Sequence, residues 1–244
     1  MIIFVVPVYN EEEVIEQVIS ELFMHFSNSN ILAIVIDDLS KDSTHQKLIQ
    51  LGRIYGKKIR VVRNEKNQGH GQSVMIGLHL ALQNEFTACV TFDGDADFKI
   101  EDIKNALQKF DFTTGDCKVL EGIRVHRSEP TYRRVVSRIT RVLISIIAKK
   151  NIRDANTPIR IYSKYSLQDI LKNIPKNTLT PNIFISIIAR KNKIEVIEHQ
   201  MRTFMRKGSF STSTWGKKAK LFPSWKFLVF LYKSLSQLLK FLFQ

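Results

Sequence analysis

The sequence of 244 residues is long enough for one domain with a substantial core, and its 44% hydrophobic and 25% charged residues exclude a disordered chain. Its two cysteines are too few for a disulfide framework or a cysteine zinc site, which favours a reducing compartment. The charge is divided unevenly: residues 1–110 contain 11 Lys and Arg against 15 Asp and Glu, whereas residues 111–244 contain 26 against 8. The second half is therefore expected to face an anionic surface, either a membrane or a nucleic acid.

The first half alternates strand-like and helix-like segments. Short runs rich in valine and isoleucine predict strands, and the stretches between them carry apolar residues at helical spacing. The predicted strands are Ile2–Val6, Leu32–Ile36, Ile59–Val62 and Ala88–Phe92, and the predicted helices are Glu12–Phe26, Ser43–Tyr55 and Gly71–Leu82. This alternation predicts a mostly parallel α/β sheet, covered by helices on both faces, with a ligand site at the carboxyl ends of the strands.

Polar clusters follow the first two predicted strands. Pro7, Tyr9 and Glu11 come after the first strand and can frame a nucleotide base, although the pattern also fits an ordinary strand end and helix start. After the second strand, Asp38 is interpreted as a ligand, since a carboxylate accepts hydrogen bonds from the N–H groups of a base. The polar side chains that follow are assigned to capping the next helix; they are Ser40, Asp42 and Thr44.

The most specific cluster is Asp93-Gly94-Asp95, which follows the predicted strand Ala88–Phe92. Carboxylates flanked by small residues at a strand end form a hard-oxygen site suited to Mg²⁺ or Mn²⁺, with a diphosphate completing the coordination shell. Such an ion would neutralise a departing nucleoside diphosphate. The alternative is an acidic turn that caps the helix starting near Ile100.

The second half is expected to meet the anionic surface through two helices. After a strand at Val119–Gly122, a helix from about Tyr132 to Lys150 sets arginines against aliphatic side chains, a pattern typical of interfacial helices and also of ordinary surface helices. A strand at Ile194–Glu198 precedes an apolar tail, Trp225–Gln244, whose three lysines argue against a membrane span. The tail is expected to lie in the membrane interface, with a coiled-coil or homodimer helix as the second interpretation.

In order and spacing, these segments resemble the family-two inverting glycosyltransferases, which have the Rossmann-like GT-A fold. Within that family they are similar to the enzymes that load sugars onto dolichyl and other polyprenyl phosphates. The segments that carry the resemblance span nearly the whole chain: VVPVYNEE, DDLSKDST, NQGHGQSVMIGL, FDGDADFKIED, EGIR, RRVVSR, RDANTPIRIY and RKGSFS.

The resemblance implies a role for each matching residue. The nucleotide-sugar would contact Pro7, Tyr9, Glu11, Ile36, Asp38, Asp93 and Gly94. The metal and the diphosphate would bind at Asp93 and Asp95, and the residues implied in catalysis are Asp93, Asp95, Arg124, Asp154 and Arg206. The acceptor phosphate would contact Arg124, Arg134 and Ser137.

Three positions depart from the family pattern. Asp97 stands where the family often has Gln or Ser, and it would be an extra metal-shell group or a solvated side chain. Thr212 stands where the family has a lysine, so that Lys217 or Lys218 would have to substitute. Pro158 replaces a glycine of the acceptor loop, which leaves the shape of that loop and the acceptor open.

The sequence therefore predicts transfer of a sugar, with inversion, from a UDP- or GDP-sugar to a polyprenyl phosphate, which needs no general base because the attacking oxygen is already anionic. The alternative is a hydroxyl acceptor on a lipid-linked glycan or cell-surface polysaccharide, with Asp154 as the base. A nucleic acid partner is not expected, because the basic segment Arg124–Lys150 contains only Tyr132 for stacking on bases. A non-catalytic nucleotide-sugar sensor has no sequence feature in its favour.

The chain is predicted to comprise a catalytic domain and a short tail. Residues 1–220 would form the GT-A domain, with a nucleotide-sugar half at 1–118 and an acceptor half at 119–220, and residues 221–244 would form the membrane-associating tail. The apolar N-terminus has no basic leader and is expected to be the first strand. These features predict a peripheral protein at the cytoplasmic face of the membrane.

Overall fold

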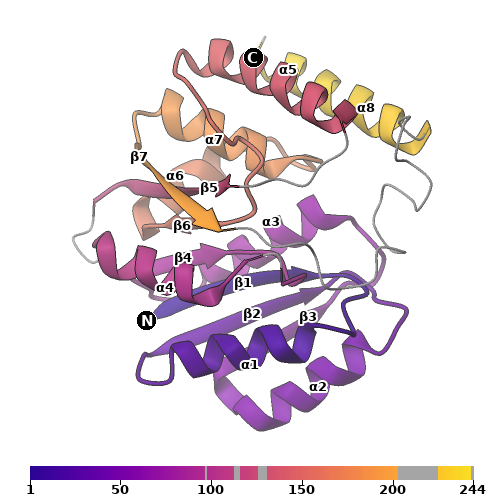
Figure 1. Ribbon diagram of the computed structural model, residues 1–244, viewed down its shortest axis with the longest axis vertical. Helices are drawn as coiled ribbons and strands as arrows, with labels where there is room; N and C mark the ends of the chain where they lie inside the picture. Colours follow the sequence, from indigo (N-terminus) through magenta and orange to yellow (C-terminus); the bar gives the residue numbers. More distant parts are fainter. Residues whose placement is uncertain (97, 113–115, 126–130, 203–224, 243–244) are drawn as a thin grey trace.

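The computed structural model describes residues 1–96, 98–112, 116–125, 131–202 and 225–242 (Figure 1). These residues form one sheet of seven strands in the order β3-β2-β1-β4-β6-β5-β7. The strands are β1 (Ile2–Val8), β2 (Ile31–Asp37), β3 (Ile59–Arg63), β4 (Ala88–Thr91), β5 (Lys118–Val125), β6 (Arg160–Tyr162) and β7 (Glu195–Arg202). The helices are α1 (Ile15–His25), α2 (Thr44–Tyr55), α3 (His70–Ala81), α4 (Ile100–Lys109), α5 (Thr131–Ala148), α6 (Lys164–Asn173), α7 (Pro181–Lys191) and α8 (Trp225–Leu242), and η1 (Gly56–Lys58) is a 3₁₀ turn.

The mostly parallel sheet predicted from the sequence is confirmed. Pairs among β1, β2, β3 and β4 are parallel, as is the pair β5–β7, whereas β6 runs antiparallel between β4 and β5. The carboxyl ends of β1, β2, β3 and β4 consequently lie at one edge of the sheet. The loops that leave these four strands contain the polar clusters picked out from the sequence.

The hydrophobic core has two layers, one on each face of the sheet, as expected. In β1, Phe4 and Val6 face the layer that contains α1, α2 and α4, while Ile3 and Val5 face the layer that contains α3, α6 and α7. Helix α3 lies very close to the sheet, because a Cβ at Gly77 would lie only 2.2 Å from Cγ1 of Val5. Glycine at this position therefore sets the distance between α3 and the central strand.

Helices α5 and α8 lie at the end of the molecule opposite α2 (Figure 1). Both contribute to the layer that contains α7: Ile144 of α5 and Leu238 of α8 are buried there, and the Phe241 ring lies 5.2 Å from that of Phe184 in α7. The predicted tail helix is thus present, and one side of it packs on the protein. Among the described residues, no helix combines the length and apolar character that a membrane span requires.

Candidate functional site

Hydrogen bonds join the loop after β1 to the loop after β2. The backbone N–H of Asn10 donates to Oγ of Ser40 (3.0 Å), and that of Glu11 donates to Oγ1 of Thr44 (2.8 Å). In return, the backbone N–H of Lys41 donates to Oδ1 of Asn10 (2.8 Å). The assignment of Ser40 and Thr44 to helix capping is therefore wrong, because their hydroxyls accept from backbone groups some thirty residues away. These bonds fix the two loops as one unit.

Asp42 also joins the loop after β1 to the loop after β2. Its carboxylate accepts from the backbone N–H of Thr44, two residues further along the chain (3.0 Å), and from the backbone N–H of Glu12 (3.3 Å). The N–H of Ser43 in turn donates to the Glu12 carboxylate (2.9 Å). The N-cap residue of α2 is Ser43, so the capping prediction is wrong for Asp42 as well, and the bond to Glu12 adds a further tie between the two loops.

Asp38 anchors the loop that precedes α3. Its buried carboxylate accepts hydrogen bonds from Nδ2 of Asn64 (2.7 Å) and from the backbone N–H groups of Gln68 and Gly69 (both 2.8 Å). Nδ2 of Asn67 donates to the backbone carbonyl oxygen of Asp38 (3.0 Å). A carboxylate has about four acceptor positions. Three are therefore used within the protein, so that the residue predicted as a nucleotide ligand also holds a neighbouring loop in place.

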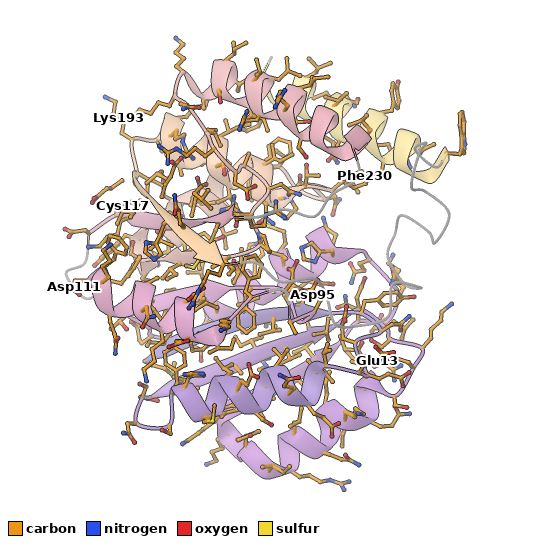
Figure 2. All side chains as sticks on the ribbon, viewed as in Figure 1. Glu13, Asp95, Asp111, Cys117, Lys193 and Phe230 are labelled. Carbon is orange, nitrogen blue, oxygen red and sulfur yellow. The ribbon has the colours of Figure 1, made fainter. Side chains whose placement is uncertain are left out.

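The Asp93-Gly94-Asp95 turn lies directly against β1. The N–H of Gly94 points at the carbonyl oxygen of Pro7 (3.4 Å), and a Cβ at Gly94 would lie 2.5 Å from Cγ1 of Val8. Only glycine lets the turn approach the strand this closely. As a result, the two aspartates lie beside the loop that carries Tyr9 and Glu11, and Figure 2 shows Asp95 at this edge of the sheet.

His70 is a member of this site that the sequence analysis missed. It is the first residue of α3, and its Nε2 lies 3.6 Å from Oδ1 of Asp93. Asp38 fixes the preceding residue, Gly69, and Gly71 packs against the backbone of Leu179, where a Cβ would lie 2.6 Å from the carbonyl oxygen. The loop that delivers His70 to Asp93 is thus held on both sides. The signal that was available in the sequence was the Gly-His-Gly triplet just before a predicted helix.

Three residues of these loops have left-handed backbone conformations that are rare outside glycine. They are Asn10, Leu39 and Ala96, with φ angles of 55°, 62° and 58°, and each follows the end of a strand. Such conformations cost on the order of 1–3 kcal/mol each and persist where surrounding contacts enforce them, as they do at many active sites. Three of the six non-glycine residues with such conformations in the described chain thus lie at this one edge of the sheet, which supports a functional site there.

In the second half, the structure pairs Arg124 with Asp154. The guanidinium donates from Nε to Oδ2 (2.8 Å) and from Nη2 to Oδ1 (3.0 Å), and Nη2 also donates to the carbonyl oxygen of Asn156 (3.1 Å). The Asp154 side chain is 4% exposed. The residue expected to bind phosphate and the residue considered as a general base therefore form one ion pair.

Arg160 holds the same acceptor loop from its other side. Its fully buried guanidinium donates to the carbonyl oxygens of Ala155 (3.0 Å) and Thr157 (2.7 Å), and the hydroxyl of Thr91 in β4 donates to that of Pro158 (3.1 Å). Two arginines and a threonine thus bind five consecutive residues. The loop with Pro158 in place of glycine is accordingly a defined structure.

A buried charge network below this loop was also not predicted. Glu121 is fully buried and lies 2.9 Å from Nη2 of Arg190 and 3.5 Å from Nη2 of Arg160, and it accepts from the hydroxyl of Ser186. A buried carboxylate is very unfavourable unless charged and hydrogen-bonding partners compensate it. The network joins β5, β6 and α7, and thereby fixes the strands that carry Arg124 and Arg160.

The remaining predicted site residues fall into two groups. Ile36 is fully buried within β2, and Ser137 is exposed on α5. Arg134 lies within α5, and its side chain is outside the described part of the structure, as are the whole of Asp97, Arg206, Thr212, Lys217 and Lys218.

The residues at the carboxyl edge fit a divalent cation bound together with a diphosphate. In the described part of the chain no group of three or more His, Cys, Asp and Glu side chains can hold a metal by itself. Mg²⁺, however, is usually bound by one or two carboxylates, substrate phosphate oxygens and water. Asp93 and Asp95 would supply those carboxylates, on a turn that Gly94 allows to lie against β1.

Comparison with known proteins places this arrangement in a family. The profile of "Glycosyl transferase family 2" matches residues 3–171. The UDP-N-acetylglucosamine–dolichyl-phosphate N-acetylglucosaminyltransferase of Methanococcus voltae is 24% identical over 228 residues, covering 88% of this chain and 90% of the relative. The dolichol-phosphate mannosyltransferase of Pyrococcus furiosus is 25% identical over 80% of this chain, which spans 54% of that protein's length.

Solved structures share the fold. Glucosyl-3-phosphoglycerate synthase from Mycobacterium tuberculosis, in complex with Mn²⁺, UDP and phosphoglyceric acid, superposes with a TM-score of 0.68. The match covers 99% of this chain and 78% of that structure at 16% sequence identity.

Proposed function

Because the chain belongs to glycosyl transferase family 2, we propose that this glycosyltransferase moves a sugar, with inversion, from a nucleoside diphosphate to a polyprenyl phosphate. The observation that carries the choice of acceptor is the ion pair between Arg124 and Asp154, which engages the carboxylate that a hydroxyl acceptor would need as its base. The names of the relatives from Methanococcus voltae and Pyrococcus furiosus, which act on dolichyl phosphates, support the same choice.

The donor would bind across the carboxyl edge of the sheet. Its nucleotide would lie between Tyr9 and the loop anchored by Asp38, and its diphosphate would lie beside Asp93 and Asp95. A divalent cation, Mg²⁺ or Mn²⁺, would supply the positive charge that stabilises the departing diphosphate. The rigid loops would hold the anomeric carbon in place, so that little motion is needed to reach the transition state.

At the acceptor side, a phosphate oxygen would form the new bond to the anomeric carbon as the bond to the nucleoside diphosphate breaks. No proton has to be transferred. Asp154 would instead orient Arg124 toward the phosphate, with help from Arg134 and Ser137, since arginine binds phosphate through charge-assisted hydrogen bonds. For a hydroxyl acceptor, Asp154 would have to give up both bonds to Arg124 to take the proton.

Helices α5 and α8 would meet the cytoplasmic face of an anionic membrane as a peripheral surface. On α5, Ile139 and Ile146 are 55% and 69% exposed, and on α8, Trp225 and Tyr232 are 78% and 74% exposed. Basic side chains such as Arg138 accompany them. Large exposed apolar side chains next to cations are typical of surfaces that bind the membrane interface.

The acceptor assignment is tested by Asp154→Asn, with Asp95→Asn as the control that should abolish transfer to any acceptor. If Asp154 only positions Arg124, the variant should raise KM for the lipid phosphate and lower kcat by less than about tenfold. Removal of a general base would instead lower kcat by about 10²–10⁴-fold. That larger loss in a folded variant would contradict the proposal.

A second measurement on the unchanged protein covers the case in which Asp154→Asn does not fold. Single turnovers in H₂O and D₂O should proceed at the same rate with a phosphate acceptor, because no proton moves in the transition state. A clear solvent isotope effect on the transfer step would favour the hydroxyl acceptor.

A further inference from the structure

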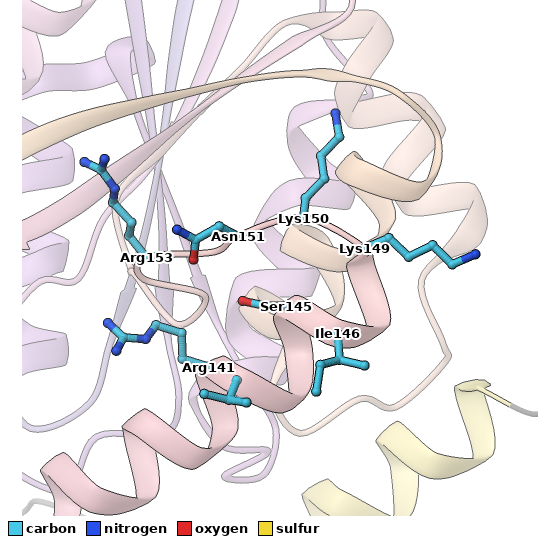
Figure 3. Close-up of a pocket in the computed structure, with 8 residues that line it drawn as sticks. Arg141, Ser145, Ile146, Lys149, Lys150, Asn151 and Arg153 are labelled. Carbon is cyan, nitrogen blue, oxygen red and sulfur yellow. The ribbon is translucent and has the colours of Figure 1, made fainter.

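A basic pocket lies on the second half of the chain, apart from the residues assigned to the donor, the metal and the acceptor phosphate. It is formed by the last turns of α5 and the segment that follows, and its volume is about 650 Å³ (Figure 3). Four of its lining residues are basic: Arg141, Lys149, Lys150 and Arg153. Among the residues that the structure describes, none that lines it is acidic.

The polar groups of the pocket are arranged for an anion. Figure 3 shows the guanidinium groups of Arg141 and Arg153 on one side of the pocket, the side chains of Ser145 and Asn151 nearer its middle, and the ammonium groups of Lys149 and Lys150 pointing away from the two guanidinium groups. Arg153 is held from outside the pocket by Glu198, whose Oε2 lies 3.3 Å from Nε. Arginine binds phosphate through forked, charge-assisted hydrogen bonds, so that this side of the pocket suits a phosphate group.

The end of α5 opposes anion binding, but only weakly. The carboxyl end of a helix carries about half a negative charge. Here the carbonyl oxygens of Ser145 and Ile146 already accept hydrogen bonds from the N–H groups of Lys150 (3.1 Å) and Lys149 (3.2 Å). Glu198 offsets part of the charge of Arg153, but the three other positive charges in the lining, on Arg141, Lys149 and Lys150, still outweigh the remaining helix dipole.

The other part of the lining is apolar. Val142 and Ile146 are one helical turn apart on α5, and they are 51% and 69% exposed. Inorganic phosphate would leave both side chains in water, whereas the glycerol backbone and acyl chains of a lipid would cover them. Phosphate-binding groups beside exposed aliphatic groups therefore match an amphiphile.

We propose that this pocket binds the phosphodiester headgroup of an anionic phospholipid that is not a substrate. Arg141 and Arg153 bind the phosphate, Lys149 and Lys150 add positive charge, and Val142 and Ile146 contact the start of the acyl chains. The site would fix the orientation of α5 on the membrane, and it goes beyond the proposed function by adding a second lipid to the one that receives the sugar.

The test is a calorimetric titration of the full chain with dihexanoyl-phosphatidylglycerol below its micelle concentration. We expect saturable binding of one lipid per chain and none of dihexanoyl-phosphatidylcholine. The triple variant Arg141→Gln, Lys149→Gln, Lys150→Gln should bind roughly 100-fold more weakly, at about one kcal/mol per basic residue. Arg153 is left unchanged because it also pairs with Glu198.

A matched control removes the same charge at the other end of the molecule. Arg53, Lys57 and Lys58 are exposed at the end of α2 and in η1. Their replacement by Gln should change the affinity by less than about threefold, because charges beyond the Debye length are largely screened. An equal loss in both triple variants would mean diffuse attraction and would overturn the proposal.

Two further experiments distinguish binding of a phospholipid from binding of other phosphate compounds. Val142→Ser with Ile146→Ser should weaken binding of the phosphatidylglycerol and leave inorganic phosphate binding unchanged. Inorganic phosphate that binds as tightly as the lipid would show a free-anion site, and one-for-one displacement by farnesyl phosphate would show the acceptor site. Either result overturns the inference, while transfer to a polyprenyl phosphate in neutral detergent is measured separately and tests only the proposed function.

Discussion

The substitution Asp38→Asn separates the two roles of this carboxylate. In the protein without nucleotide it accepts three hydrogen bonds, from Asn64, Gln68 and Gly69. Asparagine keeps one oxygen, which can serve Asn64 and Gln68, but its amide group then faces the Gly69 N–H and leaves that donor unsatisfied. An unsatisfied buried donor costs about 1–3 kcal/mol, and loss of the negative charge weakens the two remaining bonds by roughly 0.5–1 kcal/mol each.

The free energy of unfolding should therefore fall by about 2–5 kcal/mol, which corresponds to a decrease of roughly 4–20 °C in Tm for a chain of this size. Urea denaturation without nucleotide measures it. The control is Asp42→Asn, where a half-buried carboxylate accepts from Glu12 and Thr44 at 3.3 and 3.0 Å, and where a loss of less than about 1 kcal/mol is expected. Equal stability of Asp38→Asn and the natural chain would show that Asp38 does not anchor the loop.

Three other predictions concern the core, the sheet edge and pH. Burial raises the pKa of Asp102, but the hydrogen bonds and charge of Arg202 outweigh it and hold that pKa below its usual range. The ion pair thus adds stability above the unfolded-state pKa of about 3.9, and this stability is lost as the pH falls through the lower folded-state pKa. The Tm difference between the natural chain and Asp102→Asn should therefore shrink from pH 7 to pH 2. A constant Tm difference would contradict a stabilising role of the Asp102–Arg202 pair. Cys89 is fully buried, and burial strongly raises the pKa of its thiol. The folded protein should therefore react with a thiol reagent only at the exposed Cys117. Rapid reaction of two equivalents of reagent per chain would contradict this prediction. Gly94→Ala should lower the free energy of unfolding by about 1–3 kcal/mol and abolish metal-dependent nucleotide binding, because the new Cβ would clash with Val8 of β1. A calorimetric titration with nucleotide and metal that is unchanged in the variant would contradict the close approach of this turn to β1.

The sequence predicted the alternating strands and helices of the first half better than the contacts between them. The buried strands at Ile2–Val8 and Ile31–Asp37 are long runs of aliphatic residues, and their ends were correct within two residues. Strand β6 has three residues, which is too few for any periodicity to show, and α6 and α7 were not predicted either. The antiparallel position of β6 in the middle of the sheet depends on its partners and not on its own sequence.

In the candidate site, the carboxyl-edge clusters could be predicted because parallel strands bring their ends together. The partners of individual side chains could not. Arg124 and Asp154 are thirty positions apart, on β5 and on the loop before β6, and nothing local indicates their pairing. Ser40 satisfied the local rule for a helix cap, but its hydroxyl oxygen instead accepts a hydrogen bond from the backbone N–H of Asn10. Such competition between local and distant partners appears only in the folded chain.

The decisive measurement is the release of nucleoside diphosphate from a panel of UDP- and GDP-sugars, with the product identified by mass spectrometry. With one donor, release should require both a polyprenyl phosphate and Mg²⁺ or Mn²⁺, and it should yield a polyprenyl monophosphate sugar of inverted anomeric configuration. Turnover of the matching polyprenol at a similar rate, or full activity in excess EDTA, would contradict the proposed reaction.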